Sequence, residues 1–319
     1  MLQFIERKFF LVCLLTCSLI KADAQMDTSR IEKEIILPTK TGNIYGTLTT
    51  PLVFNKIPLA LIIAGSGPTD RNGNSIYSQN NCLKQLADKL CDNQIASVRF
   101  DKRGIGESAD STKESDLRFE TYINDVKAWI AFLKKDKRFS KIIIIGHSEG
   151  SLIGMIVAKD SADMFISIAG AGQSADEILK QQLSGQPKQV QDIADRMIDS
   201  LKAGKTVQDV PKDYFALFRP SVQPYMISWF KYDPANEFHN LLIPALILQG
   251  TNDLQVSVGD AKKLMAANSK AHLDLIENMN HIFKIVADKQ ANIASYNDPA
   301  LPVSEELVND IVNFINAPN

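Results

Sequence analysis

The stretch from Ile142 to Gly150 constrains the fold more than any other part of this chain. Four consecutive isoleucines are followed by Gly-His-Ser-Glu-Gly and then, without a break, by an apolar segment of helical character. β-Branched residues favour strands, and an apolar run without alternation is typical of a strand that is buried on both faces. The stretch therefore predicts a strand, a sharp turn and a helix, with Ser148 at the turn.

Ser148 is the centre of this Gly-x-Ser-x-Gly motif. In such a turn the serine has a strained backbone, and the two glycines leave room for the chain to fold back. The hydroxyl then projects above the carboxyl end of a parallel strand, next to the amino end of a helix. We interpret Ser148 as a nucleophile, and the alternative is a serine that only caps the helix.

Strands and helices alternate over most of the chain. Two segments of alternating polarity, separated by a Thr-Gly-Asn turn, come first, and continuous apolar strands with amphipathic helices follow. The expected strands are 31–37, 45–48, 58–64, 94–100, 141–145, 164–169, 243–249 and 272–276, and the expected helices include 79–92, 119–135, 258–267 and 304–315. This order predicts an α/β fold with a mostly parallel central sheet flanked by helices.

Residues 173–237 interrupt this alternation. They contain no strand-like run; apolar residues have helical spacing between 190 and 201, and many aromatic residues follow. We expect a helical cap over the active site, inserted into a core formed by residues 25–172 and 238–319. Its aromatic side chains either line a substrate pocket or form the cap's own core, and the second is the expectation for any single one.

The first 24 residues have the composition of a targeting segment. Arg7 and Lys8 precede a short apolar run, and small residues end at Ala24. A secretory signal peptide cleaved after Ala24 is the prediction, because the run is too short to span a bilayer comfortably. The alternatives are an uncleaved anchor and a lipoprotein signal at Cys17, which the preceding Thr16 fits poorly. We expect a periplasmic or secreted protein without stable membrane insertion.

The charge and the cysteines of the remaining chain argue against other classes of protein. Removing residues 1–24 moves the formal net charge from −2 to −3, so nucleic acid is not an expected partner. Only Cys82 and Cys91 remain of the four cysteines. They lie nine residues apart in one expected helix, face opposite ways and cannot form a disulfide. No cluster of cysteine and histidine indicates a metal site, and neither a metal nor a cofactor is expected.

The four histidines restrict the choice of a base for Ser148. His147 adjoins Ser148, His239 stands before an expected strand, and His272 begins one. His147 in particular is expected to point away across the turn. His281 and Asp253 each follow the carboxyl end of a strand, and the chain order of Ser148, Asp253 and His281 is that of nucleophile, acid and base in one known fold. We expect these three residues to form a catalytic triad.

A glycine-rich loop, Gly65 to Asn74, follows another of the central strands. Such a loop leaves backbone N–H groups free to bind an anion. We expect the amide of Ser66, or of a neighbouring glycine, and the amide of Glu149 to form an oxyanion hole. The alternative is a plain flexible loop. Asp70 and Arg71 either form a buried ion pair that fixes the loop or are ordinary solvated charges.

Together these features resemble an α/β-hydrolase over essentially the whole chain after residue 24. The segments Gly65 to Asn74 and Gly146 to Gly150 resemble a bacterial branch of carboxylesterases grouped with serine aminopeptidase-like hydrolases. The resemblance implies hydrolysis of a small-molecule ester through an acyl-serine intermediate, without a cofactor. The chain departs from the wider family at Ala64, where many members have a histidine before the oxyanion glycine.

Two other functions remain open on the sequence alone. A peptidase that removes N-terminal residues would use the same triad and would need a carboxylate to bind the substrate ammonium, for which Glu149 or Asp213 is available. A non-catalytic binding protein would keep the fold without the activity, which an intact triad disfavours. The spacing of residues does not define the acyl chain, the alcohol or the oligomeric state.

Overall fold

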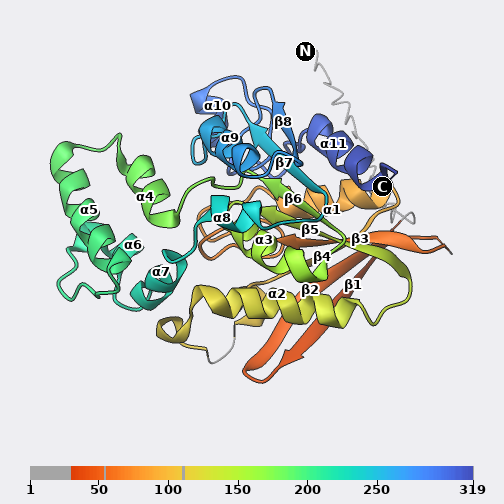
Figure 1. Cartoon of the computed structure of the whole chain (residues 1–319), viewed down its shortest axis with the longest axis horizontal. Coiled ribbons are helices and arrows are strands. Elements are labelled where there is room, and N and C mark those ends of the chain that lie inside the picture. Colours follow the sequence, from red (N-terminus) through yellow and green to blue (C-terminus); the bar gives the residue numbers. More distant parts are fainter. Residues whose placement is uncertain (1–29, 54, 110–111, 319) are drawn as a thin grey trace, which may run out of the picture.

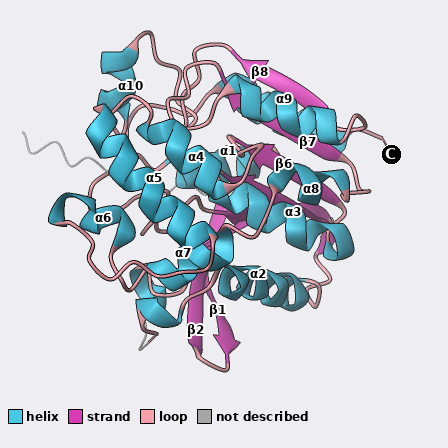
Figure 2. Cartoon of the chain, turned by 60° about the vertical axis from the view of Figure 1, so that its left-hand side comes forward, coloured by secondary structure: helices cyan, strands magenta, loops and turns pink. Residues whose placement is uncertain are grey.

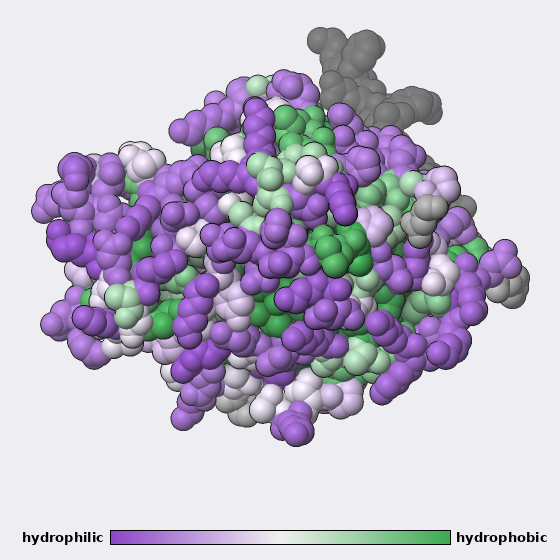
Figure 3. Space-filling model, viewed as in Figure 1, coloured by the Kyte–Doolittle hydropathy of each residue, from purple (hydrophilic) through white to green (hydrophobic). Residues whose placement is uncertain are grey.

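The computed structural model describes residues 30–53, 55–109 and 112–318 (Figure 1). The predicted signal peptide and Cys17 lie outside the described residues. None of the described helices is both long and apolar enough to cross a membrane. The face drawn in Figure 3 is mostly polar with small apolar areas between, and large groups of apolar side chains lie inside.

An eight-stranded sheet forms the centre of the described chain, in the order β1-β2-β4-β3-β5-β6-β7-β8. β2 pairs antiparallel with both β1 and β4, and all other neighbouring strands are parallel. The strands are β1 (Arg30–Thr39), β2 (Gly42–Pro51), β3 (Ile57–Ile63), β4 (Ala96–Phe100), β5 (Phe139–His147), β6 (Met164–Ile168), β7 (Ala245–Gly250) and β8 (His272–Ile276). The mostly parallel sheet predicted from the sequence is confirmed.

The four isoleucines of β5 explain why this sheet needs continuous apolar strands. Ile142 and Ile144 pack into the core on one face, and Ile143 and Ile145 pack into the core on the other. Helices cover both faces: α2 (Phe119–Leu133), α3 (Glu149–Ser161) and α9 (Val258–Ala267) the first, α1 (Cys82–Asp92) and α11 (Glu305–Asn316) the second. Successive side chains of a strand point to opposite faces, so a strand that is covered on both sides must be apolar throughout.

Helix α1 begins at Cys82, three residues later than predicted. The side-chain oxygen of Asn74 accepts hydrogen bonds from the backbone N–H groups of Asn80 and Asn81, each at 2.9 Å. Asn81 itself has a left-handed backbone, with φ of 54°. Asparagine side chains compete with the helix for backbone groups, so this segment forms a fixed turn before the helix starts.

Five α-helices lie between β6 and β7: α4 (Ala175–Leu183), α5 (Lys188–Lys202), α6 (Phe215–Phe218), α7 (Gln223–Trp229) and α8 (Pro234–His239). α5 and α6 lie at the opposite end of the molecule from α11 (Figure 1), and in the turned view the helices α4 to α7 come forward (Figure 2). Helices of this insertion enclose a core of their own, which includes Met197, Leu201, Phe218 and Phe230. α8 differs, because Phe238 is fully buried in the core beneath the sheet. The expected cap boundary at residue 237 therefore falls inside a helix that packs on the sheet.

Candidate active site

Ser148 stands between β5 and α3 with a backbone φ of 54° and ψ of −118°. Close backbone contacts explain the two glycines of the motif. A Cβ atom on Gly146 would lie 2.3 Å from the carbonyl oxygen of Gly150, and one on Gly150 would lie 2.4 Å from that of Ile63. This is the sharp turn that the motif predicts. The Ser148 side chain makes no capping hydrogen bond to α3, so the interpretation of Ser148 as a simple helix cap is wrong.

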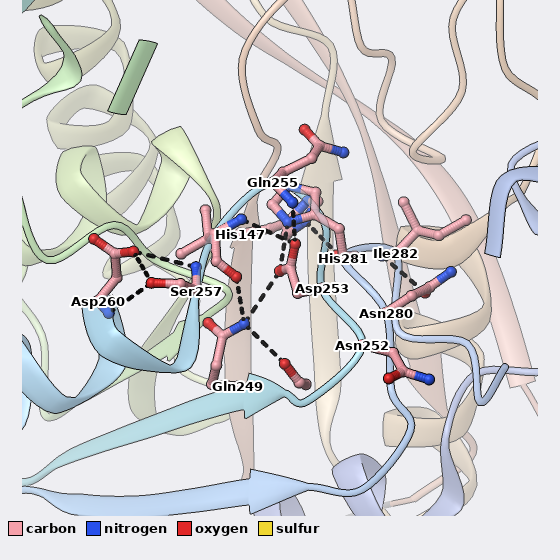
Figure 4. Close-up of polar contacts among 12 residues, drawn as sticks. His147, Gln249, Asn252, Asp253, Gln255, Ser257, Asp260, Asn280, His281 and Ile282 are labelled. Atoms are coloured by element: carbon pink, nitrogen blue, oxygen red, sulfur yellow. Dashed lines mark hydrogen bonds and ion pairs between the residues drawn. The ribbon is translucent and has the colours of Figure 1, made fainter. Parts of the chain in front are cut away.

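His281 and Asp253 form a buried pair at the carboxyl edge of the sheet (Figure 4). Nδ1 of His281 lies 2.8 Å from Oδ2 of Asp253, and the two side chains are 5% and 1% exposed. Oδ1 of Asp253 also accepts hydrogen bonds from the backbone N–H groups of Gln255 and Val256. Burial acts to raise the pKa of Asp253, but the charge and hydrogen bond of His281 together with these N–H groups hold it below its ordinary value.

An ionised Asp253 fixes which ring nitrogen of His281 carries the proton. It accepts the hydrogen bond from Nδ1, so that Nε2 is left as the basic nitrogen. His281 and Ser148 line the same cavity. The Ser148 hydroxyl has no hydrogen-bond partner among the described residues. Hydrogen bonds between a serine and a histidine base are often long without substrate and shorten when substrate binds.

His147 is not oriented as the sequence suggested. Its ring packs against that of His281 with the centroids 4.8 Å apart, and its Nε2 lies 3.0 Å from the carbonyl oxygen of His281. A carbonyl oxygen only accepts, so Nε2 of His147 carries the proton and donates it. The expectation that His147 points away is therefore wrong: the tight turn brings this side chain under the loop that follows β8, where it supports the backbone of His281.

The other two histidines lie apart from Ser148. Nδ1 of His239 is hydrogen-bonded to the carbonyl oxygen of Ala267 at the end of α9, and the ring of His272 packs against Phe314 of α11. Neither lines a cavity that contains Ser148. Among the described histidines, His281 is therefore the one with both a carboxylate partner and access to Ser148.

We predict that the buried His147 makes the protein sensitive to acid. Burial, helped by the charges of His281 and Lys102, lowers the pKa of His147 to about 3 from an ordinary value of 6.5, and the His281 carbonyl and Asp253 oppose this only in part. Between these two pH values the unfolded chain binds a proton at His147 that the folded chain does not. The free energy of unfolding should therefore fall as the pH drops below 6.5, by up to about 1.4 kcal/mol per pH unit from this group.

Denaturant unfolding of the wild type and of His147→Gln between pH 7 and pH 4.5 measures this contribution. Glutamine retains an N–H donor but does not titrate, so the variant should lose less of its free energy of unfolding on acidification. Equal pH dependence of the two proteins would contradict the assignment of a neutral, buried His147.

The loop after β3 is fixed by charges, although Asp70 and Arg71 do not pair with each other. Oδ1 of Asp70 accepts hydrogen bonds from the backbone of Asn72 and Asn74 at 2.8 and 2.9 Å. The guanidinium of Arg71 instead binds Asp101, which follows β4, at 2.6 and 3.0 Å. Each residue holds the loop through a partner of its own. Asp70 and Arg71 therefore do not form an ion pair with each other, and they are not simple solvated charges either.

The amides of Ser66 and Glu149 have no hydrogen-bond partner among the described residues, and both residues line a cavity together with Ser148. Nζ of Lys102 donates a hydrogen bond of 2.6 Å to the carbonyl oxygen of Gly65. In a trans peptide the C=O and the N–H point in opposite directions, and the described chain contains no cis peptide bond. The hydrogen bond from Lys102 therefore directs the N–H of Ser66 away from the Lys102 ammonium group. A Cβ atom on Gly65 would lie 3.2 Å from that of Ser148, which places this peptide beside Ser148.

Lys102 also neutralises the side chain of Glu149. Its Nζ lies 3.8 Å from Oε1 of Glu149, and the side chains are 3% and 2% exposed. Burial lowers the pKa of Lys102, and the carboxylate of Glu149 opposes that effect. Nothing in the sequence distinguishes Lys102 except its position two residues after a buried strand, at the edge of the sheet where the site lies.

Two cavities meet at Ser148, and Ser66 also lines both. The apolar cavity has a volume of about 300 Å³, and its lining includes Leu152, Ile178, Leu179, Leu217, Met226 and Trp229. The polar cavity has a volume of about 140 Å³, and its lining includes Thr69, Ser75, Ser78, Asn80, Gln255 and Tyr296. Most of the apolar lining comes from the helices between β6 and β7. Among the aromatic residues of this insertion, Tyr225 and Trp229 line the apolar cavity, whereas Phe218 and Phe230 belong to the hydrophobic core of the insertion.

Other reactive groups of the described chain offer no competing centre. Cys82 and Cys91 are both buried in α1 and form no disulfide, and burial raises the pKa of the Cys82 thiol to about 12. A thiol with so high a pKa is a poor nucleophile at neutral pH. No group of three or more histidine, cysteine, aspartate or glutamate side chains among the described residues has an arrangement that could hold a metal ion.

The fold and this site define the chain as an α/β-hydrolase, as the resemblance in its motifs implies. Within that class it belongs to the family described as serine aminopeptidase, S33, whose model matches residues 77–285. The matched range includes Ser148, Asp253 and His281 but not the loop that carries Ser66.

Known proteins of similar sequence or structure include several esterases. Esterase EstD of Thermotoga maritima is 27% identical over 261 residues, which are 79% of this chain and 60% of that protein, so the chain spans about three fifths of its relative. Est1E of Butyrivibrio proteoclasticus with bound ferulic acid is 16% identical, with a TM-score of 0.61 over 89% of this chain and 100% of that one. The Pyrococcus furiosus esterase Pf2001 is 14% identical, with a TM-score of 0.58 over 90% and 91%. The two structural similarities concern the fold.

Proposed function

We propose that this chain is a serine esterase whose catalytic triad consists of Ser148, His281 and Asp253. One observation carries the proposal: Ser148 at its sharp turn and His281, which is hydrogen-bonded to Asp253, line the same cavity at the carboxyl edge of the sheet. A serine hydroxyl is a poor nucleophile until a correctly oriented base takes its proton, and this arrangement supplies the base and the acid that orients it.

In the proposed reaction Oγ of Ser148 attacks the carbonyl carbon of the ester while Nε2 of His281 takes its proton. The tetrahedral intermediate then breaks its bond to the alcohol oxygen, and His281 returns the proton to that oxygen. Water attacks the acyl-serine with His281 again acting as the base, and the carboxylic acid leaves. Asp253 has a lowered pKa, so it stays ionised throughout and stabilises the imidazolium.

The amides of Ser66 and Glu149 are the proposed oxyanion hole. Both are free to donate a hydrogen bond among the described residues, and both adjoin Ser148 in the apolar cavity. Each donor of this kind stabilises a tetrahedral oxyanion by roughly 3 kcal/mol. Lys102 acts through the first of them as a positioning residue, because it holds the carbonyl oxygen of the Gly65–Ser66 peptide.

Charge in the apolar cavity favours an ester over a peptide with a free amino terminus. Glu149 already has Lys102 as its partner, and Asp213 is exposed and does not line the cavity. Arg219, which does line it, is bound to Glu114. An ammonium group placed there would lose its hydration without gaining a free carboxylate. The peptidase remains the alternative, and the relative that is named an esterase supports the ester.

We further propose that the protein acts outside the cytoplasm after cleavage behind Ala24. This rests on the composition of residues 1–24 alone. Mass spectrometry of the protein recovered from its native cells tests the point: a mature chain that begins at Gln25 agrees with it, and a chain that begins at Met1 contradicts it.

The test of the activity is hydrolysis of p-nitrophenyl esters from acetate to decanoate. Each methylene group that enters the apolar cavity gains about 0.8 kcal/mol, so kcat/KM should rise about fourfold per methylene until the cavity is full. Aminoacyl p-nitroanilides are the matched amide series. Turnover of the anilides with no turnover of any ester would favour the peptidase, and a maximum at acetate would contradict the assignment of the apolar cavity to the acyl group.

A further inference from the structure

The position of His281 distinguishes the two cavities at Ser148. His281 lines the polar cavity and does not line the apolar cavity. In the proposed esterase reaction His281 returns its proton to the departing alcohol oxygen, so that oxygen must leave on the side of His281. The acyl group is then directed to the other side, into the apolar cavity.

We propose that the polar cavity is the leaving-group site and that it binds a neutral alcohol rich in hydroxyl groups, such as a sugar or another polyol. This inference rests on the proposed esterase function. The natural substrates would then be esters that join an apolar acyl chain to such an alcohol.

The lining of the polar cavity matches an uncharged, hydrogen-bonding ligand. Hydroxyl and amide side chains predominate in it. Two histidines also line it, but its described lining contains no aspartate, glutamate, lysine or arginine. A charged alcohol such as choline would lose its hydration there without a counter-charge, which is unfavourable. Hydroxyl groups of a sugar, in contrast, can exchange their water for protein donors and acceptors of similar strength.

Several polar atoms in the cavity retain hydrogen-bonding capacity. The hydroxyl of Tyr296 accepts a bond of 2.7 Å from Nε2 of Gln255, and its own proton has no acceptor among the described residues. Burial raises the pKa of Tyr296 to about 12, so the phenol keeps that proton at neutral pH. The hydroxyl of Ser75 accepts a bond from the backbone of Tyr77, and it too retains a free proton within the described chain.

The walls of the cavity are held together although they come from distant parts of the sequence. Oγ of Ser78 donates a bond of 2.8 Å to the carbonyl oxygen of Tyr296, which follows α10 (Lys289–Ser295). Nδ2 of Asn80 donates to Oγ of Ser78 at 2.9 Å and to the carbonyl oxygen of Gly73 at 3.1 Å. The backbones of Ser75 and Ser78 exchange hydrogen bonds of 2.8 and 3.3 Å. The free donors of Tyr296 and Ser75 therefore lie on a fixed framework, which is what selective binding of hydroxyl groups requires.

The test compares esters that share one acyl group, namely 6-O-hexanoylglucose, ethyl hexanoate and hexanoylcholine. All three form the same acyl-enzyme, so differences in kcat/KM report the alcohol, through its binding and its intrinsic reactivity. One hydrogen bond to the alcohol is worth about a fivefold change in kcat/KM. We expect the glucose ester to exceed the ethyl ester at least tenfold and the choline ester to fall below both.

Variants separate binding from the intrinsic reactivity of the alcohols. Tyr296→Phe should reduce the ratio of kcat/KM for the glucose and ethyl esters about fivefold, and Ser75→Ala, on another wall, should reduce it as well. Ile178→Ala, in the apolar cavity, should change both esters by the same factor and leave the ratio as it is in the wild type.

The outcomes distinguish this inference from the function on which it rests. Hydrolysis of the glucose and ethyl esters at equal kcat/KM, or ratios that neither Tyr296→Phe nor Ser75→Ala alters, would overturn the leaving-group site while the esterase stands. Failure to hydrolyse any hexanoyl ester would overturn the proposed function and this inference with it.

Discussion

Replacing Ser148 with alanine should lower kcat for p-nitrophenyl hexanoate by about 10⁴-fold or more. The variant lacks the oxygen that forms the acyl intermediate, and no other described group stands ready to replace it. Folding should be preserved, because the Ser148 hydroxyl makes no hydrogen bond within the described chain and alanine can occupy the same turn at similar cost in strain. Steady-state kinetics and thermal unfolding of the purified variant measure both effects.

Ser151 provides a matched control one turn further along α3. It is fully buried, and its Oγ bonds to Oγ of Ser167 at 2.7 Å, away from the reaction. Ser151→Ala should lose about 1 kcal/mol of the free energy of unfolding and keep kcat within a few-fold of the wild type. A Ser148→Ala variant that kept a tenth of the wild-type activity would contradict the assignment of the nucleophile.

Replacing Lys102 with methionine should lower kcat about 10- to 100-fold with little change in KM. Loss of one complete oxyanion donor costs on the order of 10²- to 10³-fold in kcat, and a peptide that is only freed to rotate loses part of that. The hydrogen bond from Nζ to the carbonyl oxygen of Gly65 sets the direction of the Ser66 amide, which is needed only when the oxyanion forms. Affinity for a hexyl trifluoromethyl ketone, whose adduct with Ser148 carries an oxyanion, should fall by the same factor.

The single substitution also leaves Glu149 buried without its partner, which destabilises a protein by about 3–5 kcal/mol in comparable cases. The double variant Lys102→Met/Glu149→Gln removes both charges and separates the two roles. If Lys102 only neutralised Glu149, the double variant would regain kcat and ketone affinity; if it orients the Gly65–Ser66 peptide, both stay low.

Arg103 is the control for loss of a buried cation from the same loop. It is 4% exposed, and its guanidinium binds Asp125 of α2 at 2.7 Å. Arg103→Met should lower the free energy of unfolding without a selective loss of ketone affinity. A Lys102→Met variant that loses stability as Arg103→Met does, with unchanged kcat and ketone affinity, would show a structural role alone.

The sheet could be predicted because burial leaves a periodic record in the sequence. Ile142 to Ile145 alternate between two covered faces, so their identity as a strand follows from hydrophobicity alone. At Gly146 and Gly150 a Cβ atom would collide with neighbouring backbone, so only glycine fits, and this is why the turn can be recognised from residue types. The positions of Asp253 and His281 are informative because each follows a strand, and parallel strands end at one edge of a sheet.

The contacts that loops make could not be predicted, because a loop has no period that fixes where its backbone and side chains lie. His147 lies under the loop of His281, and Arg71 binds Asp101 across two strand ends instead of its neighbour Asp70. Lys102 was missed for the same reason: a charged residue after a strand is ordinarily solvated, and only the fold shows it buried against Gly65.

The central claim is that ester hydrolysis proceeds through an acyl group on Ser148. Mixing the enzyme with p-nitrophenyl hexanoate, quenching with acid within one turnover and measuring the mass of the intact protein and of its peptides tests it most directly. The account predicts a mass increase of one hexanoyl group, confined to the peptide that contains Ser148 and absent in Ser148→Ala. Turnover of the ester with the acyl group on another residue would contradict it.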